Sequence, residues 1–517
     1  MKKRMKQVLA LGVAVMLVLG GCTKKPEEPV VEETPKVEEG EEIEVVEEET
    51  ESIVPEKQAV PLSVSIDTNQ KTYYFEDGEK AYLYLQYCDV TVEGGENVNL
   101  KKNIENWSME RSEQLRSEAL SFESDAAENL KNTGDFFNNY SLYQRITTSR
   151  IDSQVVSLLE NTDYYTGGAH GMFCREGINF DVQSGKRLNL SEIFSDYEGF
   201  QAVATEKIID YLKKNYEEEL FPDYIEMVEG IWADELGPEW YFDGSGIVII
   251  IQQYLVGPAS VGAPEIHLPY AEMKQYIKEI YLPDDSDGVS KFEKNQEIYL
   301  QISELEEELP MMLQYKDIDG IPSCALWLGN QKKTMEGFAT LTNSYLLRNH
   351  GEIFCLIEVD FASDDYVTYI YRLTEGRIQE IDQLKGSISM GNINSDKIVM
   401  EFWVNLLGTY GGVKNYRFDE NQEFVTEDTE YRLSENQVVL TTMVDLPVIL
   451  EETDSILPAG SHIVLNSTDG ERFVKFTIQE TGQTGVLLVQ RAEGDYYNVS
   501  INGINESECF EFLPYAG

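Results

Sequence analysis

The sequence predicts an α+β protein, with a mixed sheet packed with helices over residues 62–283 and all-β modules after it. Runs of alternating or continuous apolar residues, which are typical of strands, recur along the chain. Three stretches before residue 283 instead repeat apolar residues every three or four positions, as an amphipathic helix does. A chain of 517 residues is also too long for a single core, so we expect several domains.

The first 21 residues have the three-part layout of a signal peptide. Basic residues precede an apolar run, Val8 to Leu19, that is too short to span a bilayer comfortably. The run ends in Leu19-Gly20-Gly21-Cys22, which resembles the lipobox of bacterial lipoproteins. That resemblance implies that residues 1–21 are removed and that Cys22 carries lipid, which would hold the protein at the outer face of the cell membrane.

Residues 22–60 are rich in glutamate and proline and have almost no aromatic residues. Such a segment cannot bury enough apolar surface to fold, and its like charges repel one another. We therefore predict a disordered tether that holds the folded part away from the membrane. A specific binding role for the glutamate run is the alternative, but the composition favours a solvated spacer.

Residues 61–165 are predicted to form the first α+β part of a module. The helix is indicated by apolar residues three or four positions apart, and the strands by β-type apolar runs. The predicted elements, in chain order, are strands at 62–66 and 81–90, a helix from Asn99 toward Leu120, and strands at 141–146 and 154–159.

Residues 166–283 are predicted to form the second part of this module. Ser191 is a candidate N-cap for a helix that ends near Tyr216. The continuously apolar run from Ile247 to Val256 predicts a central strand. The remaining predicted elements are strands at 239–242 and 266–269 and a helix from Tyr270 through Ile280.

After a linker at residues 284–288, the sequence predicts β structure. Residues 284–445 contain short strand patterns separated by turn signals, which predict a β-rich domain of unknown type. Residues 446–517 are predicted to form a small β-barrel-like domain. Leu457–Gly460 and the turn at Gly482–Val486 resemble a small bacterial Src-homology-type barrel.

The charge of the chain excludes one class of partner and favours another. There are 41 Lys and Arg residues against 93 Asp and Glu residues, a formal net charge of −52. Such a chain repels the nucleic-acid backbone, so nucleic acid is not an expected partner. The same charge attracts a cationic protein at the cell envelope.

Four ordered segments carry a family resemblance: Thr166-Gly167-Gly168-Ala169-His170, Asp181 to Phe194, Tyr254 to Gly262, and Leu268-Pro269-Tyr270. They resemble the extracellular domain family of the lysozyme-binding anti-sigma factor RsiV and the peptidoglycan deacetylase PdaC. The resemblance implies binding of a lysozyme-like protein or of peptidoglycan. The candidate partner-binding residues are Tyr165, Gly167, Gly168, His170 and Tyr254.

The residues that could carry chemistry predict no enzyme, no metal and no cofactor. The histidines, His170, His267, His350 and His462, are isolated, so the catalytic half of a deacetylase is absent; no nucleophile elbow, P-loop or zinc spacing occurs. The alternative to a non-catalytic protein is that His170 acts as a general base, although a histidine in a Gly-Gly-Ala-His turn more often hydrogen-bonds the backbone. The segment Asp317-Ile318-Asp319-Gly320 lacks the closing acidic ligand of a calcium loop, which favours a plain turn.

The predicted function is therefore non-enzymatic binding of an extracellular partner by a membrane-anchored envelope lipoprotein. An accessory or cryptic wall-modifying enzyme and an architectural surface protein are the alternatives. Lipidation of Cys22 leaves five of the six cysteines, which favours buried free thiols and leaves one or two disulfides open.

Overall fold

The computed structural model describes residues 62–515 except 77, 79, 234–236, 303, 304, 306, 319, 434–437 and 492–498. The predicted signal peptide (1–21), Cys22 and the predicted tether (22–60) lie outside the described residues. Helices make up 20% and strands 49% of the structure, in several sheets, which confirms a mixed α+β protein with many β modules. Within the described part, no helix is long and apolar enough to cross a membrane.

A ten-stranded sheet, counted over the described residues, combines strands from residues 63 to 384. Its main path runs, in spatial order, through β1 (Ser63–Tyr74), β2 (Ala81–Glu93), β3 (Tyr140–Ile151), β9 (Gly288–Lys291), β14 (Thr340–Asn349), β15 (Glu352–Asp360), β16 (Tyr366–Thr374) and β17 (Arg377–Leu384). The hairpin of β4 (Val155–Tyr165) and β5 (Met172–Asp181) branches from β3, and β4 pairs with β3 antiparallel.

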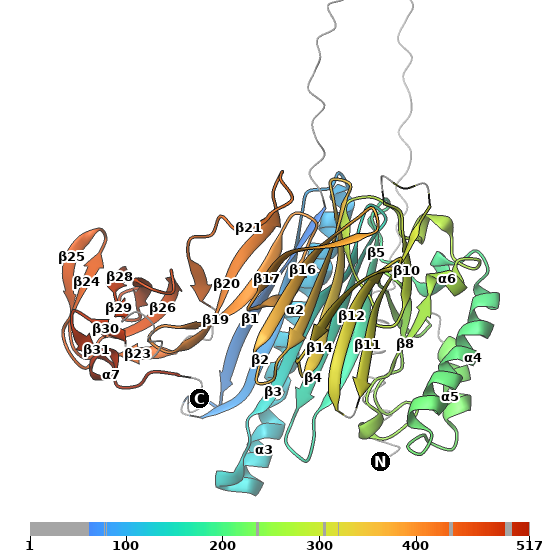
Figure 1. The fold of residues 1–517 in the computed structure, drawn as a ribbon. Coiled ribbons are helices and arrows are strands. Elements are labelled where there is room, and N and C mark those ends of the chain that lie inside the picture. The colour runs from blue at the N-terminus through green and yellow to red at the C-terminus, as the bar shows by residue number, and fades with distance from the viewer. Residues whose placement is uncertain are drawn as a thin grey trace, which may run out of the picture. The chain divides into compact units, whose positions relative to one another are not determined.

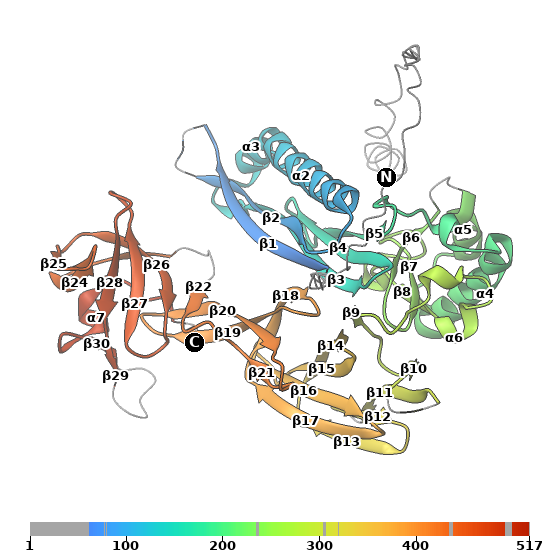
Figure 2. The same cartoon turned by 90° about the horizontal axis from the view of Figure 1, so that it is seen from above.

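Two helices form the crossover between β2 and β3, which pair in parallel and therefore need a long connection. They are α2 (Val98–Ser121) and α3 (Glu123–Thr133), followed by the short 3₁₀ turn η1 (Gly134–Phe136). The side chain of Asn97 caps α2 by accepting hydrogen bonds from the backbone N–H groups of Asn99 and Leu100. Figure 2 shows both helices along one face of β1 and β2, where α2 buries its apolar side.

The strand β9 joins segments that the sequence places in different domains. It pairs with β3 at Arg150 and Ile151 and with β14 on its other side. The sheet therefore continues across the domain limit predicted at 283/284. The turn residues before β9 are present as predicted, but a local turn signal carries no information about pairing between strands distant in sequence.

A second, three-stranded antiparallel sheet consists of β6 (Glu239–Phe242), β7 (Gly246–Ile250) and β8 (Glu265–Pro269). The helix α4 (Tyr197–Tyr216) packs on it and shares its core with α5 (Tyr224–Gly230), which leads into η3 (Ile231–Ala233) (Figure 1). The buried side of α4 consists of Phe200, Ala204, Ile208 and Leu212, at the spacing that predicted the helix.

Three predictions about where the elements around this second sheet begin or end are wrong. Ser191 lies within the 3₁₀ turn η2 (Leu190–Ile193), whose capping box is formed by Asn189 and Glu192, and Asp196 is the residue that caps α4. The strand predicted over 247–256 ends at Ile250, and the helix predicted through Ile280 is only the single turn α6 (Tyr270–Met273). Buried loop residues extend the apolar pattern in both cases, so the pattern reports burial rather than conformation.

The rest of the chain is β-rich. The loop before β8 contains η4 (Ala259–Val261), and η5 (Glu279–Tyr281) precedes β9. A four-stranded antiparallel sheet has the order β10 (Glu297–Leu300), β11 (Leu309–Ile318), β12 (Ile321–Leu328) and β13 (Gln331–Glu336). At the β11–β12 turn the backbone N–H of Gly320 donates to Asp317 Oδ1 at 2.9 Å, as in a plain turn, while Asp319 lies outside the described residues.

An eleven-stranded sheet, again counted over the described residues, continues across the predicted limit at 445/446. Its strands are β18 (Ser387–Ile393), β19 (Ile398–Asn405), β20 (Thr409–Phe418), β21 (Phe424–Val425), β22 (Tyr431–Leu433), β23 (Val439–Thr441), β24 (Leu446–Leu450), β25 (Thr453–Leu457), β26 (His462–Thr468), β27 (Phe473–Ile478) and β28 (Thr484–Leu488). The chain ends in β29 (Gln490–Arg491), β30 (Val499–Ile501), β31 (Ile504–Asn505) and α7 (Glu506–Cys509). The five described cysteines are free thiols.

Candidate functional site

The tip of the β4–β5 hairpin, residues 165–171, is the turn that contains the glycine-rich motif. Gly167 and Gly168 have φ angles of +83° and +109°, in the region that favours glycine. A Cβ at Gly171 would lie 2.6 Å from the carbonyl oxygen of Tyr164, so a side chain at this position would collide with the backbone. The motif is therefore required by the shape of this hairpin tip.

The predicted partner-binding residues come together at this tip. The Tyr165 hydroxyl donates to the carbonyl of Gly168 at 3.3 Å. The ring nitrogen Nδ1 of His170 lies 3.1 Å from the carbonyl oxygen of Gly171 and 3.4 Å from the hydroxyl of Tyr254. The structure therefore joins two motifs that are 84 residues apart in the sequence, and it leaves His170 exposed to solvent.

Two glutamines, both within the strand predicted over 247–256, hold the loop that carries Tyr254 against β5. The backbone N–H of Phe173 donates to Gln253 Oε1 at 3.1 Å. Gln252 exchanges two hydrogen bonds with the backbone of Arg175, at 3.3 and 2.5 Å. These side chains form hydrogen bonds with the backbone at the edge of β5, whose N–H and C=O groups would otherwise be unpaired. A Gln-Gln pair directly after a buried apolar run is the signal that could have found them.

Beside the hairpin tip lies the open sheet face, which consists of Tyr84, Gln86, Tyr143, Arg145 and Asp163. Successive strand side chains point to opposite faces, and the alternate residues Leu83 and Leu85 pack under α2. The open sheet face therefore points away from the helices. Where β3, β4 and β5 meet, it is hollowed by a cavity of about 280 Å³ lined by Arg145, Asn161, Asp163, Phe173 and Arg175.

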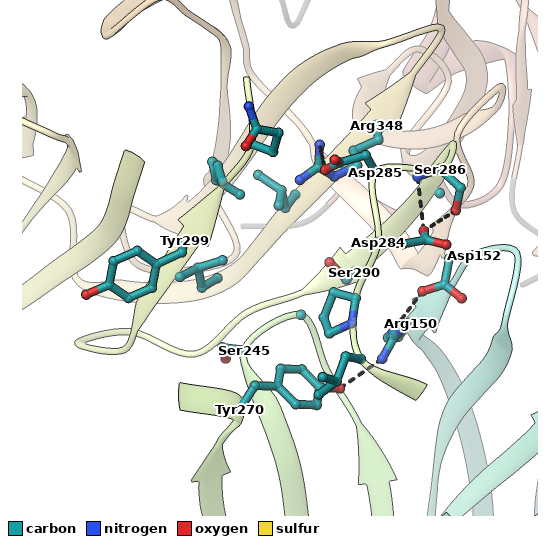
Figure 3. A pocket seen from close by; sticks show the side chains of 18 of the residues that line it. Arg150, Asp152, Ser245, Tyr270, Asp284, Asp285, Ser286, Ser290, Tyr299 and Arg348 are labelled. Atoms are coloured by element: carbon teal, nitrogen blue, oxygen red, sulfur yellow. Dashed lines mark hydrogen bonds and ion pairs between the residues drawn. The ribbon is translucent and has the colours of Figure 1, made fainter. Parts of the chain in front are cut away.

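A second cavity, of about 450 Å³, lies between the end of β3, the start of α6 and the segment around β9 and β10 (Figure 3). Arg150 lies at its wall and is 1% exposed. Its Nε donates to Asp152 at 2.6 Å, and its Nη1 donates to the Tyr270 hydroxyl at 2.9 Å and to the carbonyl of Tyr281 at 2.8 Å. Tyr270 closes the Leu268-Pro269-Tyr270 motif, so the last residue of this motif helps to hold a buried cation.

Ser245, His267 and Asp243 gather next to this cavity but do not form a proton relay. The Ser245 hydroxyl and the Asp243 carboxylate both contact Nε2 of His267, at 2.9 and 3.0 Å. A relay triad uses the two ring nitrogens for its two partners, whereas Nδ1 of His267 is buried without a hydrogen-bond partner among the described residues. Asp243 Oδ1 also accepts from the backbone N–H groups of Ser245 and Gly246, which makes the cluster a clamp on the β6–β7 turn.

The clamp predicts a dependence of stability on pH. Burial lowers the pKa of His267, but the neighbouring Asp243 carboxylate, with a contribution from Glu293, outweighs burial and raises that pKa above its ordinary value. The protonated ring therefore stabilises the folded state fully below about pH 6.5, and this contribution is lost as pH rises through the folded pKa. We expect His267→Gln to cost more free energy of unfolding at pH 6 than at pH 9, measured by urea unfolding. An equal cost at both pH values would contradict a charged clamp.

The remaining two histidines lie apart from the hairpin tip. His350, in the turn between β14 and β15 of the ten-stranded sheet, lies near Asp287, and His462 of the eleven-stranded sheet pairs with Glu480; both histidines are at the surface. Over the described residues, no group of three or more His, Cys, Asp and Glu side chains is placed to hold a metal ion.

Comparison with known proteins places one part of this chain in a family. Residues 191–271, which contain α4, the three-stranded sheet and the Tyr254 loop, match the family described as protein of unknown function (DUF3298). Residues 191–271 are thus a DUF3298 domain.

Two solved structures of the DUF3298 family are similar to this chain. One, from Bacteroides fragilis, is 20% identical with a TM-score of 0.33, covering 42% of this chain and 94% of the other. One from Pseudomonas aeruginosa is 19% identical with a TM-score of 0.32, covering 44% of this chain and 99% of the other. No curated protein matches the chain.

Proposed function

We propose that this protein is a cell-envelope lipoprotein, anchored through lipidated Cys22, that binds an extracellular partner without catalysing a reaction. The proposed partner is a lysozyme-like protein or peptidoglycan. The observation that carries the proposal is the contact between the hairpin tip and the Tyr254 loop. Two motifs far apart in the sequence build one exposed surface there, with an aromatic side chain and a histidine at its centre.

The exposure of this surface supports a binding role over a purely structural one. Thr166, Gly168, Ala169 and His170 are all exposed, and Met172 directly after the tip is 45% exposed although it is apolar. Exposed loops held by a rigid scaffold are the segments that most often carry binding residues. The architectural alternative would require this surface to be dispensable.

The charge of the chain supports a cationic protein as one of the two partners. A net charge of −52 raises the association rate of a cationic protein and makes that rate sensitive to salt. Long-range attraction alone does not depend on a single aromatic residue, whereas specific docking does. The two contributions can therefore be separated by mutation and by salt.

We expect Tyr254→Ala to weaken binding of lysozyme, or of purified wall sacculi, by about tenfold or more, because aromatic residues at the centre of an interface carry much of its energy. The measurement is titration calorimetry with lysozyme and co-sedimentation with sacculi, using the full chain in detergent. Tyr299→Ala is the matched control, since Tyr299 is a strand tyrosine of 50% exposure in another sheet.

Three outcomes would count against the proposal. Retention of lysozyme that disappears at high salt and is unchanged in Tyr254→Ala would mean charge attraction without docking. No retention of either ligand by the wild type would leave the architectural alternative. Release of sugar or acetate from sacculi that is lost in His170→Ala would instead favour the wall-modifying enzyme.

A further inference from the structure

We propose that the open sheet face binds a neutral glycan strand. This inference deepens the proposed function, because it names a ligand class for the surface beside the hairpin tip, and it rests on that function for the extracellular setting. The residues that carry it are Tyr84, Gln86, Tyr143, Arg145 and Asp163, together with Phe173 at the wall of the 280 Å³ cavity.

The register of the strands aligns these side chains across the sheet. Gln86 of β2 lies opposite Tyr143 of β3, which lies opposite Asp163 of β4, which lies opposite Phe173 of β5. Partners in register share a face, so these four residues form one row. With strands about 4.8 Å apart, the row is about 14 Å long, which suits an oligosaccharide better than a single sugar.

Two tyrosines on this face are exposed although they lie in the middle of a sheet. Tyr84 is 42% and Tyr143 is 38% exposed. Burial, and then the nearby Tyr84, raise the pKa of Tyr143. Farther along the strands the same face is covered, since Gly391 of β18 packs on Thr147. The core therefore stops short of the tyrosines and leaves two flat rings available for stacking on sugar rings.

The charges on this face are balanced, in contrast to the chain as a whole. Arg145 pairs with Asp163 at 2.6 Å, and Arg175 beside the cavity pairs with Glu265 at 2.6 Å. A strongly charged ligand of either sign gains little from such a surface, whereas a neutral ligand with many hydroxyl groups matches it. The amide of Gln86 and the paired arginine and aspartate supply donors and acceptors for those hydroxyl groups.

The surrounding hydrogen bonds hold the open sheet face in a preformed shape. Asn139 Nδ2 donates to the Tyr84 hydroxyl at 2.8 Å, and Gln70 Nε2 donates to Gln86 Oε1 at 3.2 Å. A rigid aromatic and amide surface loses little conformational freedom when it binds. The first contact holds the ring of Tyr84 in position, and the second holds the amide of Gln86.

The test uses the full chain in detergent and a neutral probe, the hexamer of β-1,4-linked N-acetylglucosamine, in titration calorimetry. We expect the wild type to bind with an affinity that salt hardly changes. Tyr143→Ala should weaken binding by about tenfold or more. Tyr143→Phe should restore it, because the stacking ring is retained. Tyr299→Ala should bind as the wild type does, and thermal melting should show that all variants are folded.

The outcomes separate this inference from the proposed function. A wild type that does not bind the neutral hexamer, or a folded Tyr143→Ala that binds it unchanged, would overturn the glycan site. If Tyr143→Ala instead weakens lysozyme binding, the open sheet face belongs to a protein interface and the inference is wrong. Tyr254→Ala tests the proposed function separately. If this variant loses lysozyme binding but binds the hexamer as the wild type does, the two sites are independent.

Discussion

Replacing Arg150 with methionine is expected to lower the free energy of unfolding by about 3–5 kcal/mol, because it removes one partner of a buried ion pair. The guanidinium is 1% exposed, and its partner Asp152 is 11% exposed. The substitution strips Asp152 of its cation and leaves the Tyr281 carbonyl without its donor. The ring of Phe242, 5.5 Å from the guanidinium, would also lose its cation–π contact.

The loss can be measured by urea unfolding of the wild type and the Arg150→Met variant. Arg145→Met is the matched control, because it removes a pair of the same length, 2.6 Å, whose side chains are 52% and 39% exposed. An exposed pair contributes only about 0–1 kcal/mol. Similar losses in the two variants would contradict the view that burial makes the Arg150 pair critical.

Adding a single methyl group at Gly177 is expected to cost more than about 3 kcal/mol, or to prevent folding. A Cβ at this position would lie 1.7 Å from the carbonyl oxygen of Trp240 and 2.4 Å from its carbonyl carbon. These are backbone atoms of β6 and cannot rotate away. The three-stranded sheet would have to move off β5, which would also break the hydrogen bond from Asn179 Nδ2 to the Trp240 carbonyl, at 2.8 Å.

Thermal melting of Gly177→Ala against Gly230→Ala would check this expectation. Gly230 ends α5, and over the described residues a Cβ there meets no atom within 4 Å. Alanine favours a helix more than glycine does, so the control should melt at the wild-type temperature or slightly above. A Gly177→Ala variant that melts with the control would mean that β5 and β6 are not in direct backbone contact.

Several elements could be predicted from the sequence because short-range patterns determine them. The spacing of Phe200, Ala204, Ile208 and Leu212 predicted α4 with its last residue, Tyr216. The pair Gly167-Gly168 is itself a local turn signal, and both residues adopt positive φ. The predicted ends of elements were wrong where apolar residues are buried outside helices and strands, as Ile251 and Val256 are in the loop after β7.

The candidate site at the hairpin tip depends on contacts between residues far apart in the sequence, which a local sequence pattern cannot predict. His170 meets Tyr254 because Gln252 and Gln253 bind the edge of β5, and amides can make such bonds from many places in a fold. The open sheet face likewise depends on register, which pairs Gln86 with Tyr143 across a crossover of two helices. Neither the length nor the composition of that crossover reveals which residues of β2 and β3 lie opposite each other.

By itself, the sequence determined the mixed α+β class, the acidic charge and the requirement for glycine at the hairpin tip, because each follows from composition or from neighbouring residues. The tertiary structure alone decided that β9 joins β3 to β14 and that Arg150 is buried against Tyr270. It also decided that two tyrosines remain uncovered in the middle of a sheet. These outcomes depend on hydrogen bonds and packing between residues far apart in the chain, whose partners exist only once the chain has folded.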